Sequence, residues 1–198
     1  MLVTQLLEEL EDWTRKNICP EIKLLKPNDA QMGSEYTPEY VHPEVFKMFI
    51  PAEGMLPKGV ETKFPAICIQ VTKGEEDLNK HEEYFWIQYA FCVWNPGNYK
   101  KTDVKGENGE KTQKIVFERN AEGWRDAWNF LDKAKRIIQS KMYLPSGLKV
   151  SRDETMKFGM FTEEDGIVVS YPEWYVWLSF KIYCGTAGRV NTEYDNLL

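Results

Sequence analysis

Cysteine and histidine are scarce in this chain, and their spacing argues against the commonest metal sites. The sequence has 198 residues, with two histidines and four cysteines, Cys19, Cys68, Cys92 and Cys184. The cysteines lie far apart and form no Cys-x-x-Cys pair, whereas zinc sites usually draw ligands from such pairs. Three of them lie in apolar segments, where free cysteine packs as a small hydrophobic residue. We therefore predict four reduced thiols and expect no bound metal and no cofactor.

Long apolar runs are also lacking. No stretch approaches the roughly 18 apolar residues that a membrane-spanning helix needs. The first residues do not have the basic start and continuous apolar run of a secretory signal. We therefore expect a protein that is not secreted and has no contact with a membrane.

Positive charge is in deficit, with 25 Lys and Arg against 31 Asp and Glu and a formal net charge of −6. Such a balance argues against non-specific nucleic-acid binding as the main function, because that binding rests on basic contacts to phosphates. Aromatic residues, in contrast, are abundant at 14%, with 7 Trp, 10 Tyr and 10 Phe. A chain of this length can bury a sizeable core, and we expect residues 1–184 to form one domain.

Helical periodicity occurs in two places. Residues 2–17 carry Leu and Trp at intervals of three and four with acidic residues opposite, which predicts an amphipathic helix. A second helix is predicted from Asn120, a plausible N-cap, to Ile138. Between the first helix and the core, residues 20–63 contain six prolines and little periodicity. They predict a long irregular arm with a short helical turn at residues 44–49.

Strand patterns occupy the rest of the chain. Strands are predicted at residues 64–71, 83–94, 115–117, 148–150, 156–161 and 174–183, with a polar turn at 73–77. The strand at 83–94 is apolar on both faces, so it lies centrally or between a helix layer and a subunit interface. Short links favour antiparallel pairing. We therefore predict an α+β fold, with a mainly antiparallel sheet and both amphipathic helices packed on one face.

Two polar segments interrupt or follow this pattern. Residues 95–114 are rich in Gly and Lys, and we expect a mobile polar loop, with an extended hairpin as the other possibility. Its candidate contact residues are Lys100, Lys101, Lys105, Lys111 and Lys114. Residues 185–198 are expected to form a flexible C-terminal tail.

No group of residues resembles an active site. The serines lie outside any Gly-x-Ser-x-Gly context, and Cys92 sits within an apolar strand where an inert thiol is expected. The clustered carboxylates at 75–77 and 163–165 lie in polar, Gly-flanked turns, where solvated side chains are expected rather than general acids. We therefore predict no catalytic residue and no enzymatic activity.

The aromatic residues exceed what one core can bury, because they lie on both faces of the same strands. This surplus favours an interface with another subunit or partner. The candidate interface residues are Trp86, Trp94, Tyr175, Trp177 and Tyr183.

Two other hypotheses remain open at this point. A small enzyme or ligand-binding domain could build a pocket from four tryptophans, Trp86, Trp94, Trp174 and Trp177. Alternatively, the lysines between residues 100 and 114 could contact nucleic acid.

Four short motifs carry a resemblance to a known family. They are a Pro-led strand at residues 64–71, a Gly-acid turn at 74–77, a Gly-Trp-Arg-Asp element that opens the second helix at 123–126, and an aromatic strand after Tyr-Pro at 171–177. Together with the first helix, residues 64–184 resemble the tail terminator (tail completion) proteins of tailed bacteriophages.

The resemblance implies assembly rather than catalysis. Family members form rings, commonly hexamers, that cap the finished tail tube and present a surface to the head connector. Expected partners are therefore further copies of the chain, the tail tube protein and a head-completion or connector protein, with DNA passing through the ring without sequence-specific binding. The expected location is the tail–head junction of the virion, and the host cytoplasm during assembly. Another neck or head–tail joining protein is the alternative.

Overall fold

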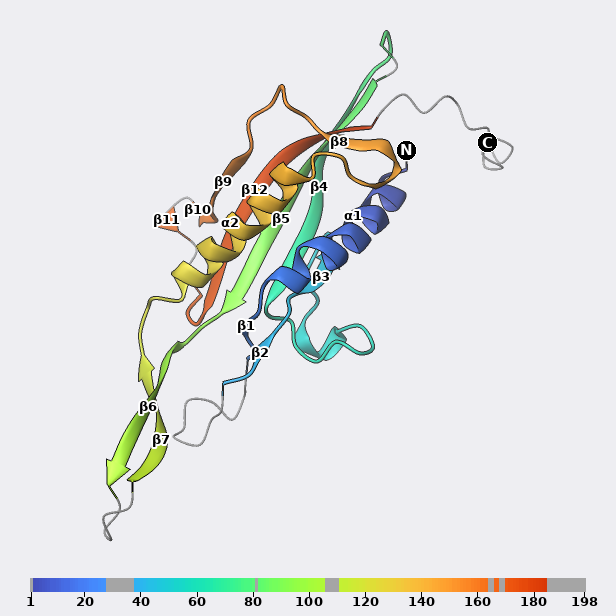
Figure 1. The fold of residues 1–198 in the computed structure, drawn as a ribbon. Coiled ribbons are helices and arrows are strands. Elements are labelled where there is room, and N and C mark those ends of the chain that lie inside the picture. The colour runs from blue at the N-terminus through green and yellow to red at the C-terminus, as the bar shows by residue number, and fades with distance from the viewer. Residues whose placement is uncertain are drawn as a thin grey trace.

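A sheet of six strands forms the centre of the molecule (Figure 1). The computed structural model describes residues 2–27, 38–80, 82–105, 111–163, 166–167 and 170–184. The sheet has the strand order β3-β4-β5-β12-β8, and β9 also pairs with β12. Its strands are β3 (Glu44–Lys47), β4 (Ala66–Asp77), β5 (Glu82–Trp94), β8 (Leu148–Val150), β9 (Lys157–Met160) and β12 (Glu173–Cys184).

Three smaller pairs of strands and two helices complete the fold. The pairs are β1 (Leu24–Leu25) with β2 (Tyr40–Val41), β6 (Gly97–Lys105) with β7 (Lys111–Arg119), and β10 (Thr162–Glu163) with β11 (Gly166–Ile167). The helices are α1 (Val3–Asn17) and α2 (Trp124–Ser140), and short 3₁₀ turns lie at Cys19–Glu21, Glu53–Met55 and Pro145–Gly147.

Pairing within the main sheet is antiparallel except at one edge. Strand β5 lies between β4 and β12 and pairs antiparallel with both, while β3 pairs parallel with β4. The prediction of a mixed α+β fold with a mainly antiparallel sheet is confirmed. The central position of β5 explains its composition, since side chains on successive residues point to opposite faces of a sheet and both faces are covered along much of its length.

Both helices pack against the same face of the sheet (Figure 1). Helix α1 lies over β3 and β4, and α2 lies over β5 and β12. Their apolar stripes join alternate residues of the strands in one buried cluster, in which the rings of Phe91 and Phe130 meet edge to face at 4.9 Å between centroids. Burial of such stripes, rather than helix propensity, supplies most of the stability of helices of this length.

One polar pair is completely buried under α1. The hydroxyls of Thr14 and Tyr89 share a hydrogen bond of 2.8 Å. Burial raises the pKa of Tyr89, although the hydrogen bond with Thr14 acts in the opposite direction. The pair fixes the height of α1 over β5, because neither hydroxyl can reach water if the other moves away.

The predicted helical turn at residues 44–49 is wrong, because β3 lies there. Val45 and Phe46 are adjacent and both buried, one in the cluster under the helices and the other on the opposite face. Only an extended chain sends neighbouring side chains to opposite faces. The arm at residues 20–63 therefore contributes an edge strand to the sheet, where we had expected irregular structure with a short helical turn.

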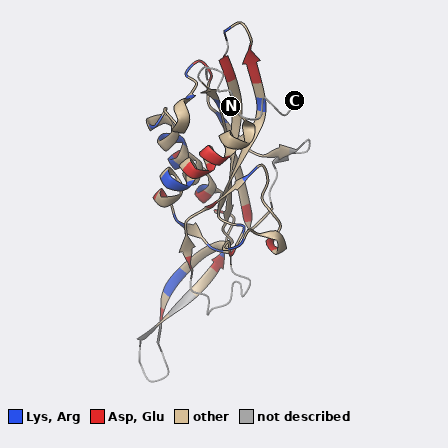
Figure 2. Cartoon of the chain, turned by 90° about the vertical axis from the view of Figure 1, so that its right-hand side faces the viewer, with Lys and Arg blue, Asp and Glu red and all other residues tan. Residues whose placement is uncertain are grey.

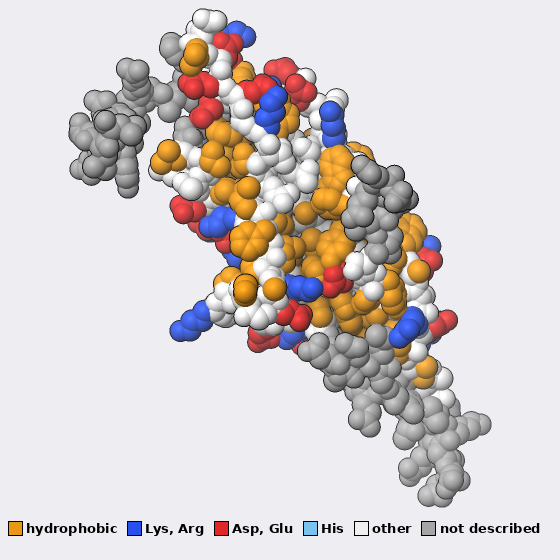
Figure 3. Space-filling model, turned by 180° about the vertical axis from the view of Figure 1, so that it is seen from behind, with side chains coloured by type: hydrophobic (Ala, Val, Ile, Leu, Met, Phe, Trp, Pro, Cys, Tyr) orange, Lys and Arg blue, Asp and Glu red, His pale blue; other side chains and the backbone are white. Residues whose placement is uncertain are grey.

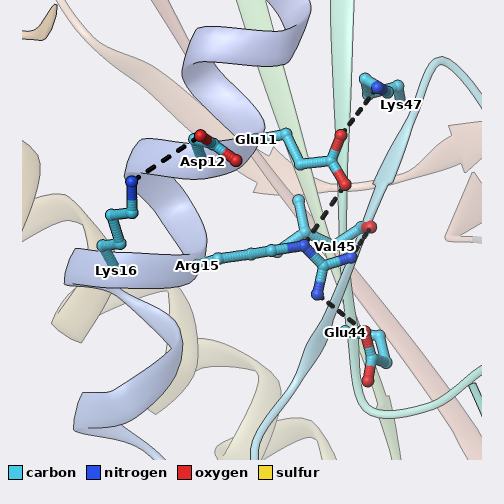
Figure 4. A network of polar contacts seen from close by, with 7 residues as sticks. All are labelled: Glu11, Asp12, Arg15, Lys16, Glu44, Val45 and Lys47. Atoms are coloured by element: carbon cyan, nitrogen blue, oxygen red, sulfur yellow. Dashed lines mark hydrogen bonds and ion pairs between the residues drawn. The ribbon is translucent and has the colours of Figure 1, made fainter. Parts of the chain in front are cut away.

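A network of charged residues attaches β3 to α1 (Figure 4). Arg15 pairs with Glu44 at 2.9 Å and with Glu11 at 3.3 Å, and its Nη2 donates to the carbonyl oxygen of Val45 at 2.9 Å. Lys47 pairs with Glu11 at 2.7 Å. Partial burial lowers the pKa of Arg15, but the hydrogen bonds and charges of Glu44 and Glu11 outweigh it and leave that pKa raised. The network thus links α1 and β3 by side chains that remain partly exposed.

Three further predictions need correction. The polar turn expected at residues 73–77 is part of β4, because this part of β4 pairs with the first half of β5 and the turn follows at Leu78–Lys80. Helix α2 begins after Gly123, whereas Asn120 accepts a hydrogen bond from the backbone N–H of Glu122 and caps a turn before the helix.

Residues 97–105 and 111–119 form paired strands, so the loop expected at 95–114 is wrong over those residues and the hairpin alternative holds. The tail predicted at 185–198 lies outside the described residues.

We predict that Tyr89→Phe lowers the free energy of unfolding by about 1–3 kcal/mol, because it leaves the buried Thr14 hydroxyl without its partner. The double variant Tyr89→Phe with Thr14→Val should recover part of this loss, since it removes both polar groups. Denaturant unfolding of the two variants checks this. A single variant as stable as the original chain would contradict the assignment.

Candidate interaction surface

The face of the sheet opposite the helices is covered over only part of its area (Figure 3). Near the start of β4 and the ends of β3 and β5, the arm folds back over the sheet and forms a second buried cluster. Its buried members are Leu25, Phe46, Phe64, Ala66, Cys68, Ala90, Cys92 and Trp94, and Ile50, Leu56, Val60, Tyr99, Phe161 and Tyr175 pack against them. The arm therefore supplies much of the cover that the second apolar face needs.

This cluster contains two of the five candidate interface residues. Trp94 is only 7% exposed, so its burial within one chain removes it as a surface contact. Tyr175 meets Phe64 edge to face at 6.0 Å, and its hydroxyl donates to Glu173. Burial together with this hydrogen bond raises the pKa of Tyr175. The burial of Trp94 argues against the prediction that it contacts another subunit. Sequence alone did not show that the arm would pack in the same cluster as Trp94.

The four-tryptophan pocket is also excluded by this arrangement. Trp174 belongs to the cluster under the helices, and its indole Nε1 donates to the carbonyl oxygen of Asn95 at 3.1 Å. Trp94 belongs to the cluster on the opposite face. Trp177 is half-buried, and its Nε1 donates to the carbonyl oxygen of Met160 at 3.0 Å, which ties β9 to β12. The tryptophans thus serve separate parts of the fold.

The uncovered part of this face carries aromatic rings interleaved with lysines. Lys181 Nζ lies 4.2 Å from the ring centroid of Tyr84 and 4.5 Å from that of Trp86, and Lys73 Nζ lies 4.9 Å from the Trp86 ring. The ring of Tyr183 lies 5.3 Å from that of Tyr84. We call these five residues the aromatic–lysine cluster. Trp86 and Tyr183, both only partly buried, are the candidate residues that it brings together.

The cluster is organised by its own contacts. The side chain of Lys181 is only 15% exposed, because it lies across both rings and approaches Glu154 at 3.9 Å. The hydroxyl of Tyr84 donates to Glu82 at 2.5 Å, and this hydrogen bond to a carboxylate raises the pKa of Tyr84 to about 12. Cation–π contacts of this kind hold the aromatic faces in fixed positions. The surface is therefore preorganised for contact.

A cleft of about 420 Å³ adjoins the cluster at Tyr84 and Tyr183. Its other walls come from β8 and the segment around it, including Tyr143, Lys149 and Arg152. Sequence reasoning missed these residues, because none belongs to a recognisable motif and only the sheet brings them beside β5 and β12.

A two-stranded ribbon, β6 with β7, extends beyond the main sheet (Figure 1). Its strands pair from Gly97↔Arg119 to Lys105↔Lys111, and within the described residues they pair with no other strand. The rings of Tyr99 and Phe117 meet at 5.0 Å near its base, and Lys100 forms an ion pair with Glu118. The five predicted contact lysines, Lys100, Lys101, Lys105, Lys111 and Lys114, all lie in these two strands.

The direction of the ribbon is fixed by a set of hydrogen bonds around Asn95. The Asn95 Nδ2 donates to Asp126 at 2.6 Å, and its Oδ1 accepts from the backbone N–H of Gly97 at 2.9 Å. Its carbonyl oxygen accepts from the Trp174 indole, and its backbone N–H donates to the carbonyl oxygen of Pro172 at 2.9 Å. The hydroxyl of Tyr171 donates to the carbonyl oxygen of Pro96. We call this set the ribbon root.

Gly123 has no side chain, and this leaves room for Trp174 and Asn95 in the ribbon root. A Cβ at this position would lie 2.3 Å from Trp174 Nε1 and 2.8 Å from Asn95, which is closer than real Cβ atoms approach. Two motifs that carry the family resemblance thus meet here: Gly123 and Asp126 from the start of α2, and Tyr171 with Trp174 from the start of β12. Their shared role is to hold the point at which the ribbon leaves the sheet.

The four thiols take no part in this surface. All four cysteines are buried and unbridged. Burial raises the pKa of Cys19 to about 12 and those of Cys68 and Cys184 to about 11, and it also raises the pKa of Cys92. Thiolates, the reactive form, are therefore rare at neutral pH.

No family model matches this chain, and no curated protein matches it. Within the described ranges, no helix is long and apolar enough to cross a membrane, and no three His, Cys, Asp or Glu side chains are grouped to hold a metal ion.

We predict that Gly123→Ala lowers the free energy of unfolding by about 1–3 kcal/mol, because the added methyl group overpacks the ribbon root. Gly54→Ala is the matched control, since a Cβ there meets no atom within 4 Å. Thermal and denaturant unfolding of both variants measure the difference. Equal stability of the two variants would contradict the close approach of Gly123 to Trp174 and Asn95.

Proposed function

We propose that this protein is a ring-forming virion assembly protein of the tail-terminator type, which caps a phage tail tube and joins it to the head connector. The observation that carries the proposal is the ribbon, which is anchored at its root and has no strand partner among the described residues. A two-stranded ribbon is at best marginally stable in water by itself. Such a ribbon gains its stability when it docks on another molecule, as a subunit of an assembly does.

The aromatic–lysine cluster supplies a second argument. Tryptophan and tyrosine are enriched among the residues that dominate protein–protein binding energy, and they act from preorganised positions at low entropy cost. Trp86 is held in this way by Lys73 and Lys181, and the ring of Tyr183 packs against that of Tyr84. The ribbon and the cluster together give one chain two separate surfaces, as a subunit that contacts both its own copies and a tube must have.

The net charge of the chain is compatible with a ring through which DNA passes. The net charge of −6 disfavours tight binding of a polyanion. A ring of such subunits, with six copies as the expected number, would let DNA pass without holding it. The ring would meet the tube protein on one side and a head-completion or connector protein on the other.

The test is a tube elongation assay with the tail tube protein that the proposal expects the same genome to encode. We predict that the purified protein stops elongation, so that electron micrographs show short tubes with extra density at one end. Trp86→Ala should weaken this capping by about tenfold or more, because it removes a central aromatic contact. Phe49→Ala is the control, since Phe49 is 68% exposed and takes no part in the contacts of the aromatic–lysine cluster given above.

Tubes that reach the same length at saturating amounts of the protein would contradict the proposal. Binding to the head-completion protein without capping of tubes would instead assign the chain to another part of the neck.

A further inference from the structure

We infer that the ribbon of one copy docks along the open edge of β4 in the next copy, so that subunits join head to tail. The closed ring in which this contact would repeat rests on the proposed function, whereas the contact itself can be tested with the chain alone. The inference combines three features: an open strand edge, opposite charges, and the placement of the two surfaces at opposite ends of the molecule.

The open edge belongs to the second half of β4. Strand β3 covers β4 only from Ala66 to Ile69, and Met48 then donates its backbone N–H to the carbonyl oxygen of Ile69. From Gln70 to Asp77, β4 pairs with β5 on one side, and the described part of the chain places no strand on the other. Residues 72–76 are exposed. An edge of this kind presents unpaired backbone groups to which an added strand can bind.

The two surfaces carry opposite charge. The β4–β5 end, residues 72–84, has five acidic residues and two lysines, whereas the strands of the ribbon have six basic residues and two acidic ones. Figure 2 shows the acidic residues on the β4–β5 hairpin and basic residues on the ribbon. Opposite charges across paired strands stabilise the pair and select its partner. The charge pattern therefore favours ribbon-to-edge contact over ribbon-to-ribbon contact.

The two surfaces cannot meet within one chain. The ribbon continues from the end of β5, and the β4–β5 hairpin lies at the other end of the molecule (Figure 1). The ribbon root holds the ribbon in this direction through Asn95 and Asp126. A contact between different surfaces of identical copies is heterologous, and it produces a closed ring or an open filament. The occupant of the β4 edge is therefore a second copy of this chain.

Charge reversal provides a sharp test. One variant carries Lys100→Glu and Lys101→Glu in the ribbon, and the other carries Glu75→Lys and Glu76→Lys on the edge. Each variant alone should self-associate more than about tenfold more weakly than the original chain, because like charges then face each other. An equimolar mixture should recover assembly, since every ribbon again meets an edge of opposite charge. Mass from light scattering and sedimentation velocity, measured over a range of concentrations, reports each state.

Control variants distinguish the effect of the reversed charges from a loss of association caused by misfolding. Lys58→Glu with Lys157→Glu makes the same change in net charge as the ribbon variant, on exposed residues that belong neither to the ribbon nor to β4, and it should leave association unchanged. Recovery in the mixture cannot come from misfolded variants. For the original chain, raising the salt from about 0.1 M to about 1 M shortens the Debye length from about 10 Å to about 3 Å and should weaken assembly.

Cross-linking identifies the surfaces that meet. A chain with Lys101→Cys is mixed with a chain with Glu76→Cys and treated with a short bismaleimide, to which the buried native thiols react slowly. We expect the cross-linked dimer to contain one chain of each kind. The dimer is resolved by mass, with the two variants distinguished by isotope labelling.

Several results would overturn the inference: an original chain that stays monomeric up to its solubility limit, a mixture that fails to recover assembly, or cross-links only between ribbons. So would a gel shift with duplex DNA that the ribbon variant abolishes while its self-association is unchanged, because the lysines would then serve nucleic acid. These outcomes are independent of tube capping, so failure of this contact is distinguishable from failure of the proposed function.

Discussion

The structure depends on the need to cover both faces of β5. This strand is apolar on each side, and its neighbours β4 and β12 extend both apolar faces into a sheet. Both faces must therefore be shielded from water. Two amphipathic helices cover one face, and the arm covers part of the other. The long proline-rich segment is therefore a structural component, which supplies both a strand and the cover for the second cluster. What it leaves uncovered is the aromatic–lysine cluster.

The same requirement determines where the chain can offer contacts to other molecules. At one end of β5, the second cluster is followed directly by the ribbon root, where Asn95 forms hydrogen bonds with Asp126, Trp174 and the backbone of Pro172. At the other end β4 and β5 run beyond β3 as a polar pair of strands. A molecule with a fixed projection at one end and an open edge at the other is suited to repeated, directional contact with copies of itself.

Much of the fold could be predicted from the sequence, because its helices and apolar strands have clear periodicity. The central place of β5 followed from its two apolar faces, and α1 and α2 followed from their stripes. The ribbon and the second half of β4 were harder to predict, since strands exposed on both sides need no alternation of polar and apolar residues. Strand β3 was missed because four residues are too few to show a period.

The site was predicted only in part. Aromatic residues beyond the needs of one core drew attention to the second face, but sequence could not show that the arm buries Trp94 and leaves Trp86 at the surface. The role of Asn95 had no signal except its place in an Asn-Pro-Gly turn, because its partners Asp126 and Trp174 come from distant parts of the chain. Lysines on a polar segment indicated a contact, but only the strand pairing showed that they line a projecting ribbon.

The most direct measurement is a cryo-electron microscopy reconstruction of tail tubes incubated with this protein. We expect a closed ring of copies at one end of each tube, with the ribbon of every copy lying along β4 of its neighbour. Tube ends without added density would contradict the view of this protein as a self-assembling cap, whereas a ring in which the ribbons contact no neighbouring copy would contradict the ribbon contact.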